Sequence, residues 1–373
     1  MAGNCKYYKQ KKQVSYDNGV TWQDVSPAEY QKGDLYEADS NDCGYTPSGG
    51  YAAQYLTFRA LDSGTFKFSG LTINYSLDNG ATWEELRNNT NTPAIAAGNT
   101  ILWKYESLDS SVIVERGRFS SSGRFIVYGN IMSMAFGDDF ISATAVNGHS
   151  LSYLFSYCTG LTSAENLVLP ATSIGARSYE CMFYGCTNLT TAPAILPATQ
   201  LSGYCYYGMF EGCTSLTTAP VLPATTLAEG CYYGMFVSCT SLTTAPELPA
   251  TRLAPYCYQE MFYACYSLTT PPQLPATTLA DCCYDGMFIS CTSLTTAPVL
   301  HATTLVDYCY YQMFFNCTNL NSVTCLATDI SAEDCTYWWL ADVSATGTFT
   351  KAAGMNDWPS GADGIPDGWT VVE

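Results

Sequence analysis

The sequence carries little charge, and most of that charge is of one sign. Only 13% of the 373 residues are charged, and 15 basic residues against 33 acidic ones give a net charge of −18. A typical soluble domain has about twice this share of charged residues. Between positions 178 and 350 the only lysine or arginine is Arg252. Such a chain repels a phosphate backbone, so no nucleic-acid partner is expected.

Long apolar runs are also missing. No stretch approaches the about 18 apolar residues of a membrane-spanning helix, so no membrane insertion is expected. The first residues, Met1 to Lys9, contain no apolar segment of the kind found in an export signal. This pattern favours a protein that reaches the cell exterior without a signal, as a virion component released by lysis does. The alternative is that a leader has been removed.

What the sequence does contain is a repeat. The same frame returns every 26 residues, and its methionines are Met209, Met235, Met261, Met287 and Met313. Met182 precedes the first of them by 27 residues, and Leu154-Phe155 opens a degenerate copy 28 residues earlier. About seven units therefore occupy residues 154–335. One unit cannot bury its apolar face alone, but stacked units can.

Each unit is predicted to hold one helix and one extended segment. After Thr225-Thr226, which can cap a helix, apolar residues recur every four positions at Leu227, Cys231, Met235 and Cys239. The next stretch, 242–249, is rich in threonine and proline, which suits extended backbone. We therefore expect strands on one side of the stack and helices on the other.

The repeat resembles a known family. The frame from Met209-Phe210 through Cys213-Thr214 to Leu222-Pro223 is similar to the BspA-like, or Treponema-type, leucine-rich repeat. That resemblance implies a solenoid and a surface adhesin, as in Bacteroidetes surface proteins and the phages that infect those bacteria. This chain departs from the family by placing Ala-Pro where the family has isoleucine, as at Ala219-Pro220. Proline lacks a ladder donor, so a continuous parallel sheet is in doubt there.

The region before the repeats has β-type signals. Two octapeptides, 15–22 and 76–83, fit the Asp-box pattern Ser-x-Asp-x-Gly-x-Thr-Trp, a hairpin turn in which Asp17 or Asp78 bonds local backbone. Asp boxes are known from sialidase propellers as a folding element, and two copies cannot make a propeller. Alternating segments follow, separated by turn residues as in a β-sandwich: Tyr55–Arg59, Thr65–Phe68 and Arg124–Tyr128.

These signals together predict an α+β multidomain protein. Residues 1–45 form an N-terminal β module for docking, and 46–150 form a β-sandwich with Asp-box hairpins. Residues 151–335 form a leucine-rich-repeat-like solenoid of about seven 26-residue units. Residues 336–373 break the period and form a C-terminal cap over its last open edge.

The cysteines follow the repeat. Of 18 cysteines, 16 lie between 158 and 335, and they form two columns: Cys205, Cys231, Cys257, Cys283 and Cys309, then Cys213, Cys239, Cys265, Cys291 and Cys317. Eight residues of helix span about 12 Å, too far for a disulfide within one unit. The thiols either fill the narrow interior or pair between neighbouring units in an oxidising compartment. No C-x-x-C occurs, so neither a metal nor another cofactor is expected.

Signs of catalysis are weak. His149 and His301 are isolated, and no nucleophile elbow or phosphate loop is present. Three acids share one repeat position near the predicted helix start, where the helix dipole would stabilise them: Glu229, Asp281 and Asp307. Calcium binding by Asp17 or Asp78 is the alternative to local turn bonding. The sequence therefore predicts that the protein is not an enzyme.

Two repeat positions vary freely, and they suggest a binding surface. One holds Tyr184, Glu211, Val237, Tyr263, Ile289 and Phe315, and the other holds Tyr207, Tyr233, Gln259, Asp285 and Tyr311. An aromatic ring where glutamate or glutamine is also accepted does not belong to the core. The candidate ligand-binding residues are Tyr184, Tyr207, Tyr233, Tyr263, Tyr311 and Phe315. The alternative is that these rings only cover neighbouring apolar surface. The constant column Tyr206, Tyr232, Tyr258, Tyr284 and Tyr310 is predicted to be structural.

The expected function is attachment without catalysis. The chain is predicted to be a phage virion protein, associated with a fibre or tail, whose repeats bind a glycan or protein on the host-cell surface. Its N-terminal module would dock onto other virion proteins or another surface assembly. One alternative is a secreted bacterial surface adhesin. Another is a glycan-active enzyme whose β region holds the site and whose repeats target it.

Overall fold

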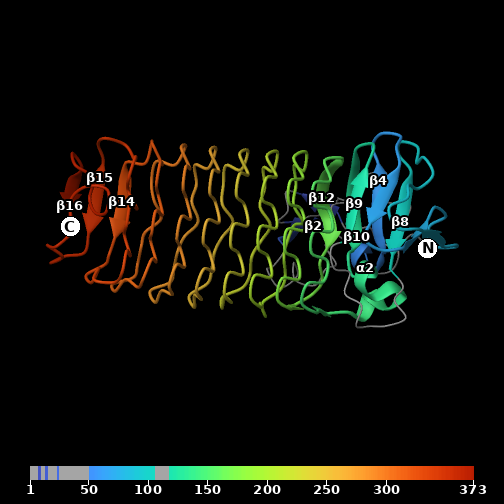
Figure 1. Cartoon of the computed structure of the whole chain (residues 1–373), viewed down its shortest axis with the longest axis horizontal. Helices are drawn as coiled ribbons and strands as arrows, with labels where there is room; N and C mark the ends of the chain where they lie inside the picture. Colours follow the sequence, from blue (N-terminus) through green and yellow to red (C-terminus); the bar gives the residue numbers. More distant parts are fainter. Residues whose placement is uncertain (1–6, 10–12, 16–22, 25–49, 106–116) are drawn as a thin grey trace.

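The computed structural model describes residues 7–9, 13–15, 23–24, 50–105 and 117–373 (Figure 1). Helix is scarce in these ranges: the 3-10 segments η2 (Gly50–Ala53) and η3 (Gly137–Ser142) and the four-residue helix α2 (Ser133–Phe136). The described chain is thus mostly β-strand, bridge and turn, and the α+β expectation is not confirmed. None of the helices in these ranges has the length and apolar character needed to span a membrane.

Three short strands are described within residues 1–45, the predicted docking module: β1 (Tyr7–Lys9), β2 (Gln13–Ser15) and β3 (Gln23–Asp24). They form an antiparallel sheet in the order β1-β2-β3. The remainder of 1–45, including most of the first Asp box with Asp17, lies outside the described residues.

The next region contains two antiparallel-rich sheets. The larger has the order β12-β10-β4-β8-β6-β7, built from β4 (Leu56–Ala60), β6 (Ile73–Ser76), β7 (Glu84–Leu86), β8 (Thr100–Lys104), β10 (Phe125–Asn130) and β12 (Leu161–Val168). The smaller pairs β5 (Phe66–Ser69) with β9 (Arg118–Ser121). The three strands predicted here are confirmed as β4, β5 and β10, within one or two residues at their ends.

Aromatic rings hold the two sheets together. The Phe58 ring lies 5.3 Å from that of Phe66 and 4.8 Å from that of Phe119, between centroids, so β4 packs on β5 and β9. The same core continues into the repeats, because Phe119 stacks near Phe155 and Phe155 stacks on Phe183. In addition, β12, which belongs to the first repeat, pairs in parallel with β10. One sheet therefore spans the boundary predicted at residue 150.

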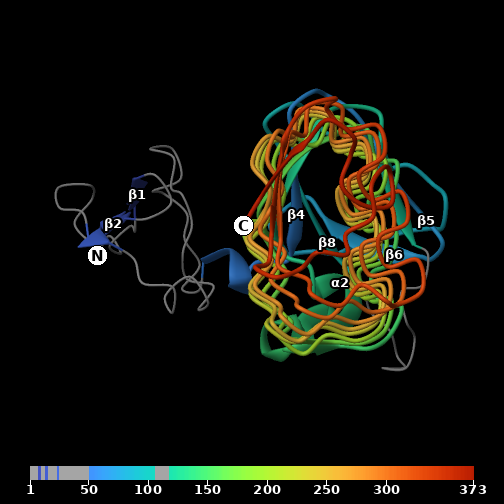
Figure 2. The ribbon, with the colours of Figure 1, turned by 90° about the vertical axis from the view of Figure 1, so that its left-hand side faces the viewer.

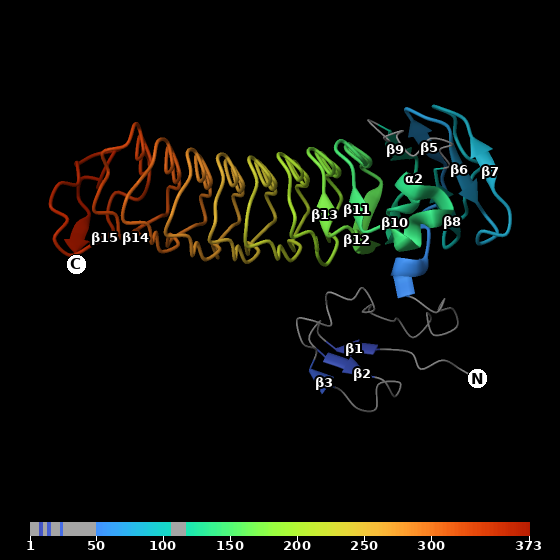
Figure 3. The ribbon, with the colours of Figure 1, turned by 90° about the horizontal axis from the view of Figure 1, so that it is seen from below.

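The repeats form a stack of similar coils along the long axis of the molecule (Figures 1 and 3). Viewed along that axis the coils superimpose closely (Figure 2). Parallel bridges join equivalent positions of neighbouring coils, including Thr191 with Thr218, Thr244 with Thr270, and Thr296 with Ser322. The period read from the sequence is therefore the length of one coil.

The helix predicted in each unit is wrong, and a run of β-turns takes its place. In the coil of Met209, alternate N–H groups donate to the carbonyl three residues back, as from Tyr207 to Tyr204 (3.2 Å). The N–H groups between them donate to the next coil, as from Gly208 to Tyr233 (2.9 Å). Every fourth residue is left-handed, with φ of 56° at Tyr204, 55° at Gly208 and 73° at Gly212. We call this segment, 202–213 and its equivalents, the turn run.

The spacing of the apolar residues explains this difference. Cysteine, methionine and cysteine recur at intervals of four, whereas a helix turns every 3.6 residues and drifts from such a column. Two positions that require positive φ also hold glycine in several coils, as at Gly230 and Gly234, and glycine weakens a helix interior. Both features favour turns that repeat every four residues.

The doubt about a continuous parallel sheet is confirmed for the proline-containing coils. Residues 190–321 contain isolated bridges and no strand. Strands return where Ala-Pro is absent, in β12 at one end and in β14 (Ser322–Cys325) at the other. There, β14 pairs in parallel with β15 (Thr348–Lys351), and β15 pairs with β16 (Thr370–Val372). A shorter pair, β11 (Ala145–Val146) and β13 (Ser173–Ile174), lies near the first coils.

The interior consists of stacked columns, as the packing interpretation predicted. All 16 described cysteines carry free thiols, and every one except Cys282 is buried. The thiols of the second column also donate to carbonyls of an adjacent coil, as from Cys213 to the Phe183 oxygen (3.1 Å). A thiol therefore fills space and bonds a backbone carbonyl, which alanine cannot do. The Tyr206 column is buried too, with rings 5.7 Å apart between Tyr206 and Tyr232.

Candidate binding face

The turn runs sort their side chains into two sets. Cys205-Tyr206 and Met209-Phe210 point into the core and are buried, whereas Tyr207 and Glu211 remain partly exposed. Because neighbouring turn runs are bonded in register, side chains at the same position of successive coils lie one above another. We call the partly exposed side of the turn runs the turn face.

All six predicted binding residues lie on the turn face. Tyr263 is exposed, with 38% of its surface accessible, and the other five are half-buried: Tyr184, Tyr207, Tyr233, Tyr311 and Phe315. They occupy the two variable columns identified from the repeat.

These rings contact one another along the stack. Ring centroids lie 5.1 Å apart for Tyr207 and Tyr233, and 5.2 Å apart for Tyr311 and Tyr337. Each ring of these pairs thus covers part of its neighbour and keeps another part accessible. Both interpretations of the rings, as packing residues and as contact residues, are compatible with this arrangement. Contact with a neighbouring ring also limits the motion of the paired side chains before any partner binds.

The sequence analysis missed three aromatic residues of this face. Tyr157 and Trp338 are 58% and 42% exposed, and Tyr337 stacks against Trp338 at 5.5 Å. They belong to the degenerate first and last coils. Extending the 26-residue frame past Met313 to position 339 would have placed Tyr337 in the column of Tyr311. Trp338 falls at the left-handed position of Glu260 and Gln312, outside the two variable columns.

Three half-buried carboxylates lie among the rings: Glu211, Glu260 and Asp285. The Gln259 amide donates to Asp285 at 2.7 Å. Burial, and then the charge of Glu260, raise the pKa of Asp285 to about 7, although the Gln259 bond opposes this shift. Burial likewise raises the pKa of Glu211 and of Glu260. Glu260 stands at a left-handed position (φ 53°), outside the two variable columns, which is why the sequence analysis did not select it.

Among the described residues, cations reach this face at its first coils. The Arg177 guanidinium forms an ion pair with Glu180 (2.8 Å) and lies over the Tyr204 ring at 4.9 Å. Arg118 lies 5.9 Å from the centroid of the Tyr157 ring. Further along, within the described chain, Glu211, Glu260 and Asp285 take part in no ion pair.

The helix-capping role predicted for Glu229, Asp281 and Asp307 is wrong, because no helix begins there. Glu229 instead accepts a bond from the Tyr204 hydroxyl (3.1 Å), and Asp307 accepts one from the Glu333 N–H (2.9 Å). These acids join one coil to the next.

The second Asp box forms the predicted local turn. The Asp78 carboxylate accepts bonds from the Thr82 N–H (2.9 Å), the Thr82 hydroxyl (2.6 Å) and the Ser76 hydroxyl (2.8 Å). These bonds, chiefly those from Thr82, lower the pKa of Asp78 to about 2. His149 and His301 are both exposed and lie in separate coils. In the part of the chain that the structure covers, no three histidine, cysteine, aspartate or glutamate side chains gather as a metal site would require.

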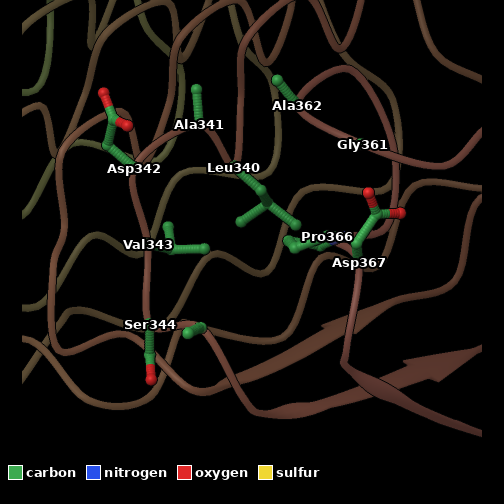
Figure 4. Close-up of a pocket in the computed structure, with 10 residues that line it drawn as sticks. Leu340, Ala341, Asp342, Val343, Ser344, Gly361, Ala362, Pro366 and Asp367 are labelled. Atoms are coloured by element: carbon green, nitrogen blue, oxygen red, sulfur yellow. The ribbon is translucent and has the colours of Figure 1, made fainter.

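A shallow pocket of about 250 Å³ lies at the far end of the stack (Figure 4). It is lined by the last turn run and the C-terminal loop, including Leu340, Asp342, Val343, Pro366 and Asp367. Asp342 and Asp367 come from opposite walls (Figure 4). None of the residues predicted to bind a ligand lines this pocket.

In comparisons with known proteins, no family model, no curated protein and no solved structure matches the chain.

Proposed function

We propose that this protein is a non-enzymatic attachment protein whose turn face binds a glycan or protein on a cell surface. The observation that supports this most directly is the series of partly exposed aromatic rings along the stacked coils. Tyrosine and tryptophan offer large contact areas with few rotatable bonds, and they dominate the energetics of many binding surfaces.

The coil stack suits this role because it holds the rings rigidly. Hydrogen bonds between coils and a continuous buried core fix each turn run in place. A partner with repeated groups can contact several coils at once, and such multiple contacts raise the overall affinity. A long, regular face therefore favours an extended partner.

We further propose that the coils are a variant of the BspA-like leucine-rich repeat, joined to a β-sandwich. The 26-residue coil and its buried cysteine, leucine and methionine columns support the first part. The packing of β4 on β5 and β9 supports the second. In this variant a turn run takes the place of the helix that was expected in each unit.

A location in a phage virion, on a fibre or tail, is part of the proposal, with the bacterial cell surface as its alternative. Antibody detection of the intact chain in purified virions would support the first location. Detection only in a bacterial membrane fraction would overturn it. The enzyme alternative has no comparable support, since local turn bonds occupy the Asp78 carboxylate.

Cell binding by the full chain tests the attachment role. The triple change Tyr184→Ala, Tyr263→Ala and Phe315→Ala should reduce binding of labelled protein to host cells at least about tenfold, as loss of central aromatic contacts does. A matched control removes exposed apolar side chains away from the turn face: Leu77→Ala, Ile141→Ala and Val221→Ala. Equal binding by wild type and both triple variants would refute the proposal.

A further inference from the structure

The first coils of the turn face show how this surface holds a cation. Arg177 lies on the Tyr204 ring at 4.9 Å while its guanidinium bonds the Glu180 carboxylate at 2.8 Å. A tyrosine face and a carboxylate together satisfy both the flat surface and the N–H donors of a guanidinium. Arg118 near Tyr157 is a second arginine on a tyrosine of this face.

The later coils repeat the tyrosine and the carboxylate without the arginine. Tyr207, Tyr233 and Tyr311 line the face beside Glu211, Glu260 and Asp285. The only basic residue between 178 and 350, Arg252, lies on another stretch of its coil, where it bridges Thr226. The ionisable side chains of this part of the face are therefore all tyrosines, carboxylates or cysteine.

Glu260 lies close enough to Glu211 and Asp285 to disfavour the charge of both. The charge of Glu260 contributes to the raised pKa of both Glu211 and Asp285. In the described chain none of the three has a cationic partner that would offset its burial. A cation from outside would relieve this repulsion, because it would add to each carboxylate the opposite charge that Glu180 receives from Arg177.

We propose that the turn face between the coils of Tyr207 and Tyr311 binds an arginine-bearing segment of a partner protein. The inference rests on the proposed function and names the partner's chemistry. Arginine is favoured over lysine because its planar group stacks on tyrosine and bonds a carboxylate at the same time. Acidic glycans are disfavoured by repulsion, and neutral glycans can donate hydroxyl hydrogen bonds to the carboxylates but supply no opposite charge.

The test uses the full chain and three labelled peptides of equal length: six repeats of Arg-Gly, of Lys-Gly and of Gln-Gly. Fluorescence anisotropy at 50 and 300 mM NaCl should rank their affinities in that order, and the higher salt should weaken binding of the two cationic peptides. The face variant is Glu211→Gln, Glu260→Gln and Asp285→Asn. It should raise the Kd of the Arg-Gly peptide about tenfold or more, as loss of charged interface partners does.

The matched control removes three exposed carboxylates elsewhere: Glu85→Gln, Asp139→Asn and Glu247→Gln. It removes the same number of carboxyl groups as the face variant and should leave Kd within about twofold of the wild type. Equal weakening by both variants would show that only the net charge attracts the peptide, and the inference would be wrong. Binding of the Gln-Gly peptide as tight as that of Arg-Gly would also overturn it. Thermal unfolding checks the fold, and Asp285→Asn alone replaces the triple variant if the latter is unstable.

Cell binding separates this inference from the proposed function. If the carboxylate variant loses attachment together with the aromatic variant, both stand. If the aromatic variant loses attachment and the carboxylate variant retains it, the attachment role stands and the cationic partner is wrong. If neither variant loses attachment, both are wrong.

Discussion

At the scale of single residues, the cysteines and the carboxylates show two different uses of burial. A buried thiol such as Cys213 remains neutral and donates a weak hydrogen bond, so a column of thiols adds apolar volume and bonds carbonyl groups. Half-buried carboxylates such as Asp285 carry a cost, because water no longer fully solvates their charge. The first use explains a core position, and the second is one basis of the proposed partner surface.

The pKa of Asp285 leads to a prediction for stability. Its folded-state pKa of about 7 lies above the ordinary value of 3.8, so between these pH values the folded protein keeps a proton that the unfolded chain loses. The wild-type free energy of unfolding should therefore fall as pH rises from about 4 to 7. Glu211 and Glu260, whose pKa values are also raised, contribute in the same direction.

The change Asp285→Asn should reduce this slope. Urea unfolding of wild type and variant at pH 4.5 and pH 8 provides the measurement, and the variant should gain relative stability at the higher pH. Glu247→Gln is the control, since Glu247 is exposed on another stretch of its coil. An unchanged difference between wild type and Asp285→Asn at the two pH values would contradict the burial of this carboxylate.

At the scale of one element, the turn run can be distinguished from a helix by glycine and alanine. Gly234 has a φ of 60°, and an added Cβ would meet its nearest atom, in Val237, at an ordinary contact distance of 3.4 Å. The change Gly234→Ala therefore tests backbone conformation with little steric clash. In a helix alanine would stabilise by about 1 kcal/mol, whereas at a left-handed position it should destabilise by about 1 kcal/mol.

The reverse change serves as the control. Ser238 occupies the next left-handed position of the same run, with a φ of 59°, so Ser238→Gly should be neutral or stabilising. Chemical denaturation of both variants shows whether each change raises or lowers the free energy of unfolding. Stabilisation by Gly234→Ala together with destabilisation by Ser238→Gly would contradict the turn run and support a helix in this segment.

At the scale of the whole molecule, the β region and the first coils share one core. Phe155 is fully buried, and its ring lies 5.7 Å from Phe119 of β9 and 5.3 Å from Phe183 of the next coil. Phe155→Ala should lower the free energy of unfolding by about 3–5 kcal/mol, the usual cost of emptying such a site. Both regions should be affected, because the ring contacts both.

Differential scanning calorimetry and tryptophan fluorescence give the measurement. Tryptophan fluorescence reports on both ends of the molecule, because Trp83 and Trp103 lie in the β region and four of the seven tryptophans lie at 338–369. Heat absorption reports on the entire chain. Ile141→Ala, at a side chain 65% exposed, should change stability by no more than about 0.5 kcal/mol. If Phe155→Ala left the unfolding of the β region unchanged, the shared core would be refuted.

The sequence alone determined the length of the coil, the identity of its inward columns and the two variable positions on its outside. Each follows from local composition, since packing selects the same residue at the same place in every coil, and Ala-Pro reveals where a ladder bond is missing. Tertiary structure decided the rest. Whether columns four residues apart lie on a helix or a turn run depends on hydrogen bonds to the next coil, such as Gly208 to Tyr233. The gathering of Glu211, Glu260 and Asp285 around tyrosines likewise exists only after the coils stack, because these residues are 25 or more positions apart in the chain.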